Sequence, residues 1–321
     1  MNAACDTLPS VTVLLVTYNH ETFVSHAIES VMAQVYRGQI RIVVADDAST
    51  DRTVAIVAEA AKRRPDVPVT FLPPEPNMGI TRNYRRGFAA CDGEFVAVIE
   101  GDDHWTSPHK LARQVGFLAS HWESGLCSTN YWVHDARTAN FQPRLPVGNG
   151  HRFFSARDLV RDNIVGNFST CVYRRSALQR LPERVFEIKA YDWAINLCVA
   201  LHGPIAFLDE PMSVYRLHAG GTWTQTGVIE RLEIQRGLIP EYDRLTEGLL
   251  HEEFEALSRH LEHAVSMERH RVVGTRAKAR IRRIAQAVAD LSPPFLSALL
   301  RGLAPPRLTR FVTTRLLGGP R

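Results

Sequence analysis

Four apolar runs that alternate with helical patterns in the first third of the chain constrain its fold most strongly. The runs are rich in β-branched residues, as buried strands are, and cover residues 11–17, 40–45, 67–72 and 95–99. Apolar side chains recur at helical spacing in the intervening segments, residues 22–34, 53–63 and 81–90. Strands that alternate with helices in this way form βαβ units with parallel strands. The sequence therefore predicts an α/β fold, with a Rossmann-like, mostly parallel sheet flanked by helices.

The rest of the chain changes from a mixed pattern to a purely helical one. Further strands are expected at residues 126–134, 169–173 and 212–217, and a loop at residues 138–152. Helices are expected at residues 108–120, 155–162 and 191–201. After about residue 226 the strand pattern ends, and helical stretches follow at residues 228–247, 250–270 and 274–291. We therefore expect a sheet-containing domain over residues 1–225 and a helical C-terminal region over residues 226–321.

The C-terminal region is strongly basic, although the whole chain has a net charge of only +4. Residues 259–321 contain 13 Lys and Arg but only 3 Asp and Glu. The rest of the chain contains 25 Lys and Arg and 31 Asp and Glu. The basic residues that alternate with apolar ones are Lys278, Arg280, Arg282, Arg283, Arg301, Arg307, Arg310 and Arg315. Such helices can bind an anionic membrane surface, each cation contributing on the order of 1 kcal/mol. They can equally pack on the first domain with their arginines solvated. No nucleic-acid-binding module accompanies the charge, so we expect no nucleic-acid partner.

The sequence also bounds the compartment in which the protein works. No apolar run has the length of a membrane-spanning helix, and the N-terminus lacks the basic and apolar regions of a signal peptide. The 5 cysteines are scattered and form no Cys-x-x-Cys pair, which argues against a disulfide framework or a zinc site. We expect a cytoplasmic protein with buried, reduced thiols. Peripheral contact with the inner face of the membrane through the basic region stays open.

Polar residues directly follow three of the predicted strands. The three segments are Tyr18-Asn-His-Glu21, Asp46-Asp47 and Glu100-Gly-Asp-Asp103. The carboxyl ends of parallel strands lie on one edge of the sheet, where α/β proteins bind their ligands. Carboxylates this close repel one another unless a cation or hydrogen-bond donors lie among them, and Mg²⁺ or Mn²⁺ prefers such oxygen ligands. The alternative is that Asp102 or Asp103 only caps the helix that follows Pro108.

Five short motifs follow one another along the chain: Val16-Thr-Tyr-Asn19, Asp46-Asp-Ala-Ser-Thr-Asp51, Asn77-Met-Gly79, Glu100-Gly-Asp-Asp-His-Trp105 and Tyr215-Arg-Leu-His218. In this order and spacing they occur in family 2 glycosyltransferases, which this chain resembles over about residues 9–223. The resemblance implies the GT-A fold for the first domain. It also implies inverting transfer of a sugar from a nucleotide diphosphate donor, assisted by Mg²⁺ or Mn²⁺. Within the family pattern, Glu100 stands where many relatives have Asp.

The resemblance implies that four residues bind the donor nucleotide. Thr17, Tyr18 and Glu21 match the segment that holds the base and the ribose. Asp47 matches the aspartate that forms a hydrogen bond with the base. UDP and dTDP are the favoured carriers of the sugar.

The resemblance implies metal, diphosphate and catalytic roles for four more residues. Asp103 matches the main metal ligand, and Asp102 matches a residue near the ribose or the metal. His218 matches a residue near the diphosphate or the metal, although a hydrogen-bonded loop histidine fits the same pattern. Asp192 matches the general base that deprotonates the acceptor alcohol, and its alternative role is to cap the helix that begins there.

The motifs that are missing also limit the function. The Gln-x-x-Arg-Trp signature of processive polysaccharide synthases does not occur, and neither do membrane helices, so we expect addition of a single sugar. The acceptor would be a glycan, a lipid-linked glycan or a small molecule, in the synthesis of cell-surface polysaccharide or another glycoconjugate. The competing hypothesis is a catalytically silent relative that binds sugar nucleotides or glycans. The presence of both Asp103 and Asp192 argues against it.

Overall fold

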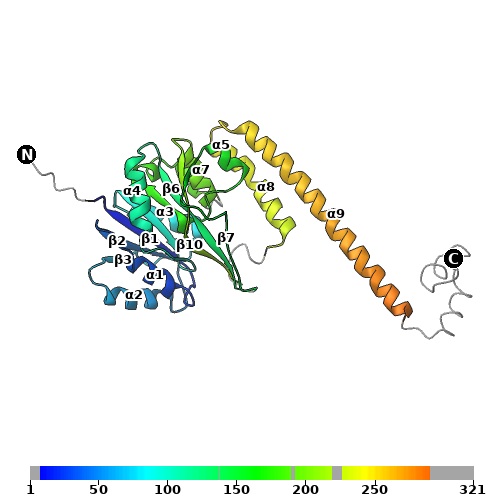
Figure 1. The fold of residues 1–321 in the computed structure, drawn as a ribbon, viewed down its shortest axis with the longest axis horizontal. Helices are drawn as coiled ribbons and strands as arrows, with labels where there is room; N and C mark the ends of the chain where they lie inside the picture. The colour runs from blue at the N-terminus through cyan, green and yellow to red at the C-terminus, as the bar shows by residue number, and fades with distance from the viewer. Residues whose placement is uncertain (1–7, 137, 189–191, 219–225, 290–321) are drawn as a thin grey trace, which may run out of the picture. The chain divides into compact units, whose positions relative to one another are not determined.

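The computed structural model of the protein describes residues 8–136, 138–188, 192–218 and 226–289. From residue 273 to residue 289 it describes the backbone alone. The chain divides into two compact units, Met1–Leu261 and Glu262–Arg321. The first unit contains the whole sheet (Figure 1). It also contains all the residues that line the cleft described below. In the second unit, the structure describes the continuation of one long helix.

A sheet of ten strands forms the centre of the first unit, in the order β3-β2-β1-β4-β9-β6-β10-β5, with β7 paired to β6 and β8 to β10. The strands are β1 Val11–Thr17, β2 Ile40–Asp46, β3 Val69–Phe71, β4 Phe95–Glu100, β5 His104–Trp105, β6 Leu126–Asp135, β7 Asn140–Pro143, β8 His151–Phe154, β9 Val172–Arg174 and β10 Ile205–Leu217. Strands β3, β2, β1 and β4 are parallel, whereas β9 runs antiparallel between β4 and β6. The predicted α/β fold with a mostly parallel sheet is confirmed.

Helices cover both faces of this sheet. They are α1 Val24–Met32, α2 Thr53–Arg63, α3 Ile80–Ala90, α4 Lys110–Ser120, α5 Ala156–Arg161, α6 Arg175–Leu178, α7 Asp192–Ala200, α8 Val228–Leu245 and α9 His251–Ala289, with 3-10 turns η1 Phe168–Thr170 and η2 Glu183–Phe186. Side chains of a strand alternate between its faces, so Val13 and Leu15 enter the core under α1, α2 and α4. Leu14 and Val16 enter the core under α3, α5 and α7. The β-branched runs are therefore buried on both sides.

The structure differs from the sequence prediction in three places. The expected loop at residues 138–152 contains β7 and the start of β8, whose partners lie on β6 and β10. Strand β10 starts at Ile205 rather than at residue 212, because the register shifts around Pro211 interrupt its pattern without ending it. The two helices expected at residues 250–270 and 274–291 form one helix, α9.

Helix α8 and the first turns of α9 pack on the same core as α7. Tyr242, Leu245, Phe254 and Leu257 are buried there. The first compact unit thus extends to Leu261, past residue 225, where the sequence prediction placed the domain boundary. The structure does not describe the side chains of the basic residues from Lys278 onward, on which the membrane hypothesis depends.

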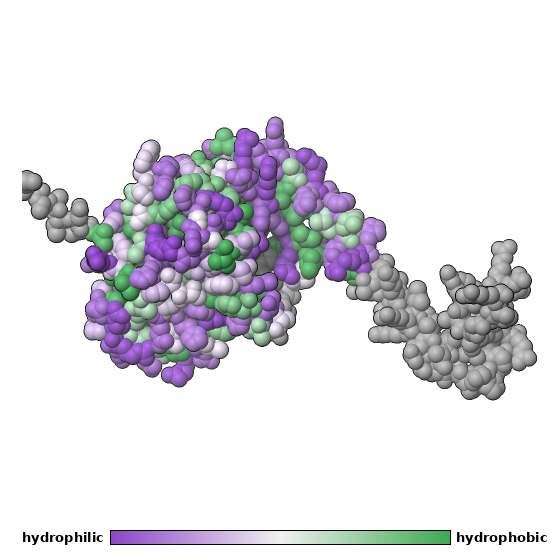
Figure 2. Space-filling model, in the orientation of Figure 1, coloured by the Kyte–Doolittle hydropathy of each residue, from purple (hydrophilic) through white to green (hydrophobic). Residues whose placement is uncertain are grey.

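Two further expectations concern the thiols and the membrane. Four cysteines, Cys91, Cys127, Cys171 and Cys198, are buried and free, as expected, while Cys5 lies outside the described residues. Within the described part of the chain, none of the helices combines the length and apolar character needed to span a bilayer. The face of the molecule seen in Figure 2 mixes hydrophilic and hydrophobic residues.

Candidate active site

A cleft of about 780 Å³ opens at the carboxyl ends of the parallel strands. We divide its lining residues into two walls by the elements that carry them. One wall comprises the residues at and after the ends of β1 and β2 and the start of α3, and what we call the opposite wall comprises β6, the loop before η1, the start of α7 and one side of α8. Five of the eight predicted site residues line the cleft: Thr17, Tyr18, Asp47, Asp102 and Asp192. Residues from both halves of the first unit therefore meet here, as expected of the edge of a parallel sheet.

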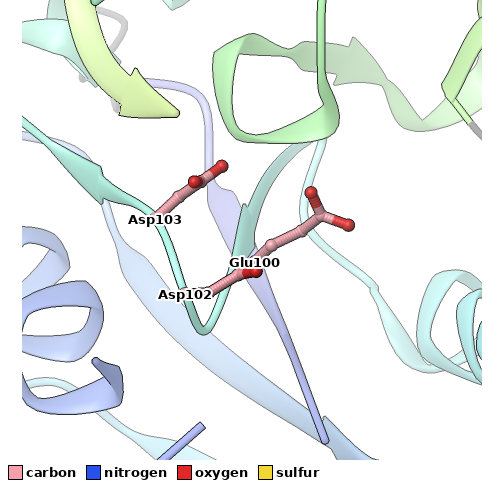
Figure 3. Close-up of side chains that lie close together, drawn as sticks. All are labelled: Glu100, Asp102 and Asp103. Atoms are coloured by element: carbon pink, nitrogen blue, oxygen red, sulfur yellow. The ribbon is translucent and has the colours of Figure 1, made fainter. Parts of the chain in front are cut away.

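Three carboxylates gather where β4 ends (Figure 3). Glu100 is the last residue of β4, and Asp102 and Asp103 belong to the tight turn after it, closed by a 3.0 Å bond from the Asp103 N–H to the Glu100 carbonyl oxygen. One oxygen from each carboxylate lies within 4.8 Å of the others. Glycine at position 101 permits this turn, because a Cβ atom there would lie 2.6 Å from His20 Nδ1. Three oxygen ligands at this spacing fit Mg²⁺ or Mn²⁺.

Asp103 is the most deeply buried member of the cluster, with 1% of its surface exposed. The Ser169 hydroxyl donates to its Oδ2 at 2.7 Å, and the backbone N–H of Arg216 donates to its Oδ1 at 3.1 Å. Burial and the charge of Asp102 nevertheless raise the pKa of Asp103 well above its ordinary value. A carboxylate in this position is stabilised by a nearby cation, which supports the fit of the site to a divalent metal.

Glu100, like Asp103, is a carboxylate whose pKa is raised by its surroundings. Its Oε1 accepts a 3.0 Å hydrogen bond from the hydroxyl of Tyr84, which is itself buried. Burial, and then the charges of Asp102 and Asp103, raise the pKa of Glu100 well above its ordinary value. Because Glu100 contributes an oxygen to the cluster and lines the cleft, it is a candidate metal ligand that the family resemblance did not assign.

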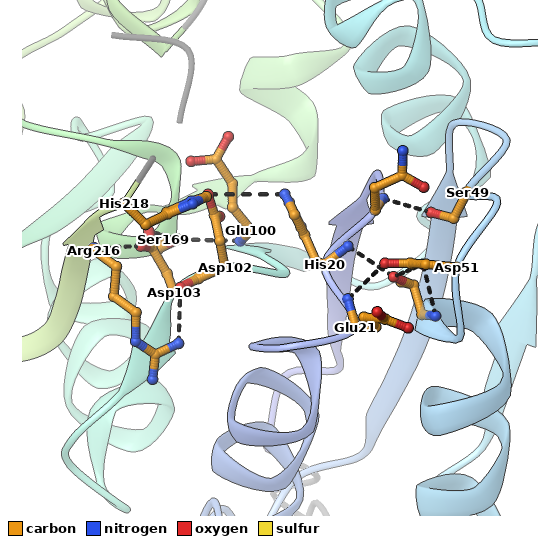
Figure 4. A network of polar contacts seen from close by, with 12 residues as sticks. His20, Glu21, Ser49, Asp51, Glu100, Asp102, Asp103, Ser169, Arg216 and His218 are labelled. Atoms are coloured by element: carbon orange, nitrogen blue, oxygen red, sulfur yellow. Dashed lines mark hydrogen bonds and ion pairs between the residues drawn. The ribbon is translucent and has the colours of Figure 1, made fainter. Parts of the chain in front are cut away.

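Asp102 differs from its two neighbours because histidines surround it (Figure 4). His218 Nε2 lies 3.1 Å from Asp102 Oδ2, and His20 Nε2 lies 3.8 Å from the same oxygen. Burial raises the pKa of Asp102, but the hydrogen bond with His218 and the charges of both imidazoles outweigh it, so the net shift is downward. His218 also packs against the ring of Phe23, with centroids 4.6 Å apart. The structure thus brings His218 to the acidic cluster, although His218 itself is not among the residues that line the cleft.

Arg216 holds the acidic turn and was not singled out from the sequence. Its Nη1 donates to the carbonyl oxygen of Asp102 at 2.8 Å. Its Nη2 donates to Nδ1 of His26 at 2.9 Å and to Nδ1 of His104 at 2.8 Å. Because Arg216 lies within the Tyr215-Arg-Leu-His218 motif, that motif was the available signal. His104, which was not predicted as a ligand, contacts Arg216 through its Nδ1.

The wall predicted to bind the donor contains three of its four expected residues. Tyr18 is 47% exposed, and Thr17 is buried with its hydroxyl donating to Asp46 Oδ1 at 2.7 Å. The two carboxylate oxygens of Asp47 accept hydrogen bonds from the backbone N–H groups of Met78 and Gly79 at 2.8 and 2.9 Å. Asp47 thereby fixes the turn that leads into α3 and also faces the cleft.

Glu21 is the predicted donor-binding residue that the structure does not bring to the cleft. Its Oε2 accepts a 3.0 Å hydrogen bond from the backbone N–H of Arg52, next to the start of α2. Its own backbone N–H donates to Asp51 Oδ2 at 3.0 Å. Glu21 therefore joins the turn after β1 to the start of α2. The neighbouring His20, which the sequence prediction did not assign, is the residue of this turn that lies beside Asp102.

Asp192 is the first residue of α7 and lies on the opposite wall of the cleft. Its Oδ1 accepts a 2.8 Å hydrogen bond from the N–H of the next residue, Trp193. Burial raises the pKa of Asp192 to about 6, against smaller downward effects from the Trp193 N–H and the Asn163 side chain. A carboxylate with this pKa can accept a proton near neutral pH, which is what a general base requires.

A mostly parallel sheet flanked by helices, with an acidic cluster at the carboxyl end of β4, is the architecture of a GT-A protein. The family model "Glycosyl transferase family 2" matches residues 12–181, and the chain belongs to this family. An uncharacterized protein of Mycobacterium tuberculosis is 33% identical over 214 residues, which is 66% of this chain and 60% of that protein. The chain thus spans about 60% of the length of this curated relative.

Two solved structures share the fold at low sequence identity. TarS 1-349 of S. aureus in complex with UDP-GlcNAc has a TM-score of 0.55 and 19% identity, over 77% of this chain and 73% of that chain. The mannosyltransferase PcManGT of Pyrobaculum calidifontis, in complex with GDP-Man and Mn2+, has a TM-score of 0.57 and 21% identity, over 96% of this chain and 86% of that chain. These likenesses support the GT-A assignment of the fold.

Proposed function

We propose that this protein is an inverting, metal-dependent glycosyltransferase that transfers a single sugar from a nucleotide diphosphate donor, with UDP or dTDP favoured, to an alcohol. The observation that carries the proposal is that Glu100 and Asp102, two members of the three-carboxylate cluster, line the same cleft as a further carboxylate, Asp192. Membership of glycosyl transferase family 2 supports the same activity.

The acidic cluster would hold Mg²⁺ or Mn²⁺ through Asp103, with Asp102 and Glu100 as further oxygen ligands. When bound, the cation supplies positive charge to the diphosphate that leaves. The complex of PcManGT with Mn2+ and GDP-Man supports this choice of cofactor. His218 orients Asp102 through its hydrogen bond and lies next to the place where the diphosphate would sit.

The nucleotide would lie along the wall formed by the ends of β1 and β2. Thr17 and Tyr18 would contact the base and ribose, and Asp47 would present its free lone pairs to the base. Glu21 would act on this segment indirectly, because its hydrogen bond with the Arg52 N–H fixes the turn that contains Tyr18. UDP-GlcNAc, the ligand of TarS, supports a uridine donor.

Asp192 would remove the proton from the attacking hydroxyl. In one displacement, the acceptor oxygen forms a bond to the anomeric carbon and the bond to the diphosphate oxygen breaks, with its electron pair leaving on the diphosphate. The acceptor proton moves to Asp192. A single displacement from the face opposite the leaving group inverts the anomeric centre.

The proposal also covers the class of acceptor and the cellular location. A glycan, a lipid-linked glycan or a small alcohol in cell-surface polysaccharide or other glycoconjugate synthesis fits a cleft open to solvent. Work in the cytoplasm, with the basic residues after Arg259 touching an anionic membrane, fits the charge of that region.

Calorimetric titration of the full chain with UDP, dTDP, GDP and CDP, each with Mn²⁺ and with EDTA, tests this function. We expect one nucleotide to bind tightly, and only with the metal. Asp103→Ala should abolish that metal-dependent binding. A folded wild-type protein that binds none of the four nucleotides would contradict the proposal and favour a glycan-binding relative without activity.

A further inference from the structure

We propose that the wall of the cleft opposite the donor binds an acidic sugar as the acceptor, with two arginines for its anionic group and two asparagines for its hydroxyl groups. The anionic group would be a carboxylate or a phosphate. This inference rests on the proposed function, because it places the acceptor on the wall that carries Asp192.

One face of helix α8 forms part of this wall. Arg231, Gln235, Leu238 and Tyr242 all line the cleft. Their spacing of four, three and four residues places them on one side of a helix. Sequence prediction assigned this helix to a separate C-terminal region, but here it supplies polar and apolar groups to the candidate active site.

The core fixes this face of α8 relative to Asp192. Tyr242 is buried and packs edge to face against Trp193, with ring centroids 5.4 Å apart. Trp193 follows Asp192 directly, and its Nε1 donates to the carbonyl oxygen of Leu159 at 2.6 Å. The end of α8 is thus packed against Trp193, the residue that follows the candidate base Asp192.

Unpaired amide atoms point to a polar ligand on the same wall. Asn163 and Asn167 line the cleft, and Asn163 Oδ1, Asn167 Oδ1 and Asn167 Nδ2 are buried without a hydrogen-bond partner among the described residues. Leaving such groups unpaired is costly, so native proteins usually satisfy them with a protein group, a water or a ligand. Adjacent hydroxyl groups of a sugar can donate to an amide oxygen and accept from an amide nitrogen at once.

Two arginines give this wall its specificity for an anion. The side chain of Arg144 contacts Asp162 through one nitrogen at 3.2 Å, in a pair whose members are 39% and 60% exposed. An exposed pair of this kind contributes little, so the guanidinium can turn to a ligand. Arg231 has no ion-pair partner within the part of the chain that the structure describes. Arginine forms paired hydrogen bonds with carboxylate and phosphate groups.

Arg144 is linked through Tyr131 to the loop that carries the two asparagines. Its backbone N–H donates to the carbonyl oxygen of Tyr131 at 2.8 Å, and both residues line the cleft. Tyr131 in turn packs over Gly166, where a Cβ atom would lie 2.5 Å from its ring. An anionic group bound to Arg144 would therefore lie beside the loop of Asn163 and Asn167, leaving a neighbouring hydroxyl to approach Asp192.

Binding of three methyl glycosides that differ only at C6 tests this inference. The probes are methyl β-D-glucoside, methyl β-D-glucuronide and methyl β-D-glucoside 6-phosphate, titrated into the full chain saturated with Mn²⁺ and the nucleotide found by calorimetry. We expect an acidic probe to bind about tenfold more tightly than the neutral one. The better of the two acidic probes identifies the source of the negative charge.

Matched arginine variants test whether this wall causes the preference for an acidic probe. Arg144→Gln and Arg231→Gln should each remove most of that preference. Arg161→Gln and Arg236→Gln, at positions that do not line the cleft, should retain it. Equal binding of neutral and acidic probes, no binding of any probe, or equal losses in the control variants would overturn the inference. So would loss of nucleotide binding alone in the first two variants, because these arginines would then hold the donor diphosphate. Absence of nucleotide binding in the wild type would instead overturn the proposed function.

Discussion

The hydroxyl group of Ser169 donates a 2.7 Å hydrogen bond to the buried carboxylate of Asp103. The same hydroxyl oxygen accepts a 3.1 Å hydrogen bond from the backbone N–H of Glu100. The carbonyl oxygen of Ser169 accepts a further bond from the Trp105 indole at 2.9 Å. One residue of η1 therefore ties together both ends of the acidic turn, and its hydroxyl fixes the direction in which Asp103 faces.

We predict that Ser169→Ala lowers the affinity for Mn²⁺ by about tenfold, because groups that orient metal ligands typically contribute that much. Electron paramagnetic resonance titration of free Mn²⁺ measures the change without any need for substrate. Ser128→Ala is the matched control, since the Ser128 hydroxyl is buried and donates to the Val165 carbonyl oxygen but does not touch the cluster. Equal metal affinities in the two variants would show that Ser169 has only a structural role.

We predict that Asp192→Asn retains nucleotide binding and loses transfer by at least about a hundredfold, because general-base catalysis contributes about that much or more. Asparagine preserves the shape of the side chain and its bond from the Trp193 N–H, but it cannot accept the proton. Calorimetry measures the first effect, and release of nucleoside diphosphate in the presence of an acceptor measures the second. Full turnover in Asp192→Asn would remove Asp192 from the mechanism.

The raised pKa of Asp192 predicts a specific pH dependence. The active form is the carboxylate, which predominates above a pKa of about 6. We therefore expect kcat/KM to fall about tenfold for each pH unit below this value and to level off above it. The raised pKa affects the stability of the folded protein in the opposite direction. Because the pKa of Asp192 in the folded protein exceeds the ordinary value of 3.8, the contribution of this group to the free energy of unfolding is present at low pH and is lost as the pH rises through about 6. Asp192→Asn should thus unfold at a higher temperature than the wild type at pH 8.

We predict that Gly101→Ala disturbs the acidic cluster, because the added methyl group would lie 2.6 Å from His20 Nδ1 and 2.8 Å from Thr17 Cγ2. Displacement of His20, whose Nε2 lies 3.8 Å from Asp102 Oδ2, would shift the Asp102 carboxylate out of the cluster, so the affinity for the Mn²⁺–nucleotide pair should fall. Gly116→Ala is the control, because no atom lies within 4 Å of a Cβ added there on α4. It should leave binding unchanged and stabilise the helix by roughly 0.5–1 kcal/mol. Unchanged binding in Gly101→Ala would contradict the close approach.

The sequence by itself determined the sheet edge and its acidic residues. The strand that contains Ile99 and the turn that contains Asp102 are neighbours in the chain, so a buried β-branched run followed by carboxylates specifies both the strand and the place where it ends. The helix that begins at Asp192 was equally local, because a helix start is encoded by the residues around it. These features depend on short-range pattern, which is why they could be predicted.

Only the tertiary structure decided what surrounds those carboxylates. Ser169 is 66 residues from Asp103, and Arg216 is 113 residues from it, so no local pattern links them. Glu21 shows the converse, since its position in the motif predicted a ligand contact but its side chain accepts from the Arg52 N–H instead. Helix α8 reaches the cleft because Tyr242 is buried against Trp193, a contact set by packing of the core rather than by the charge and periodicity of the helix itself.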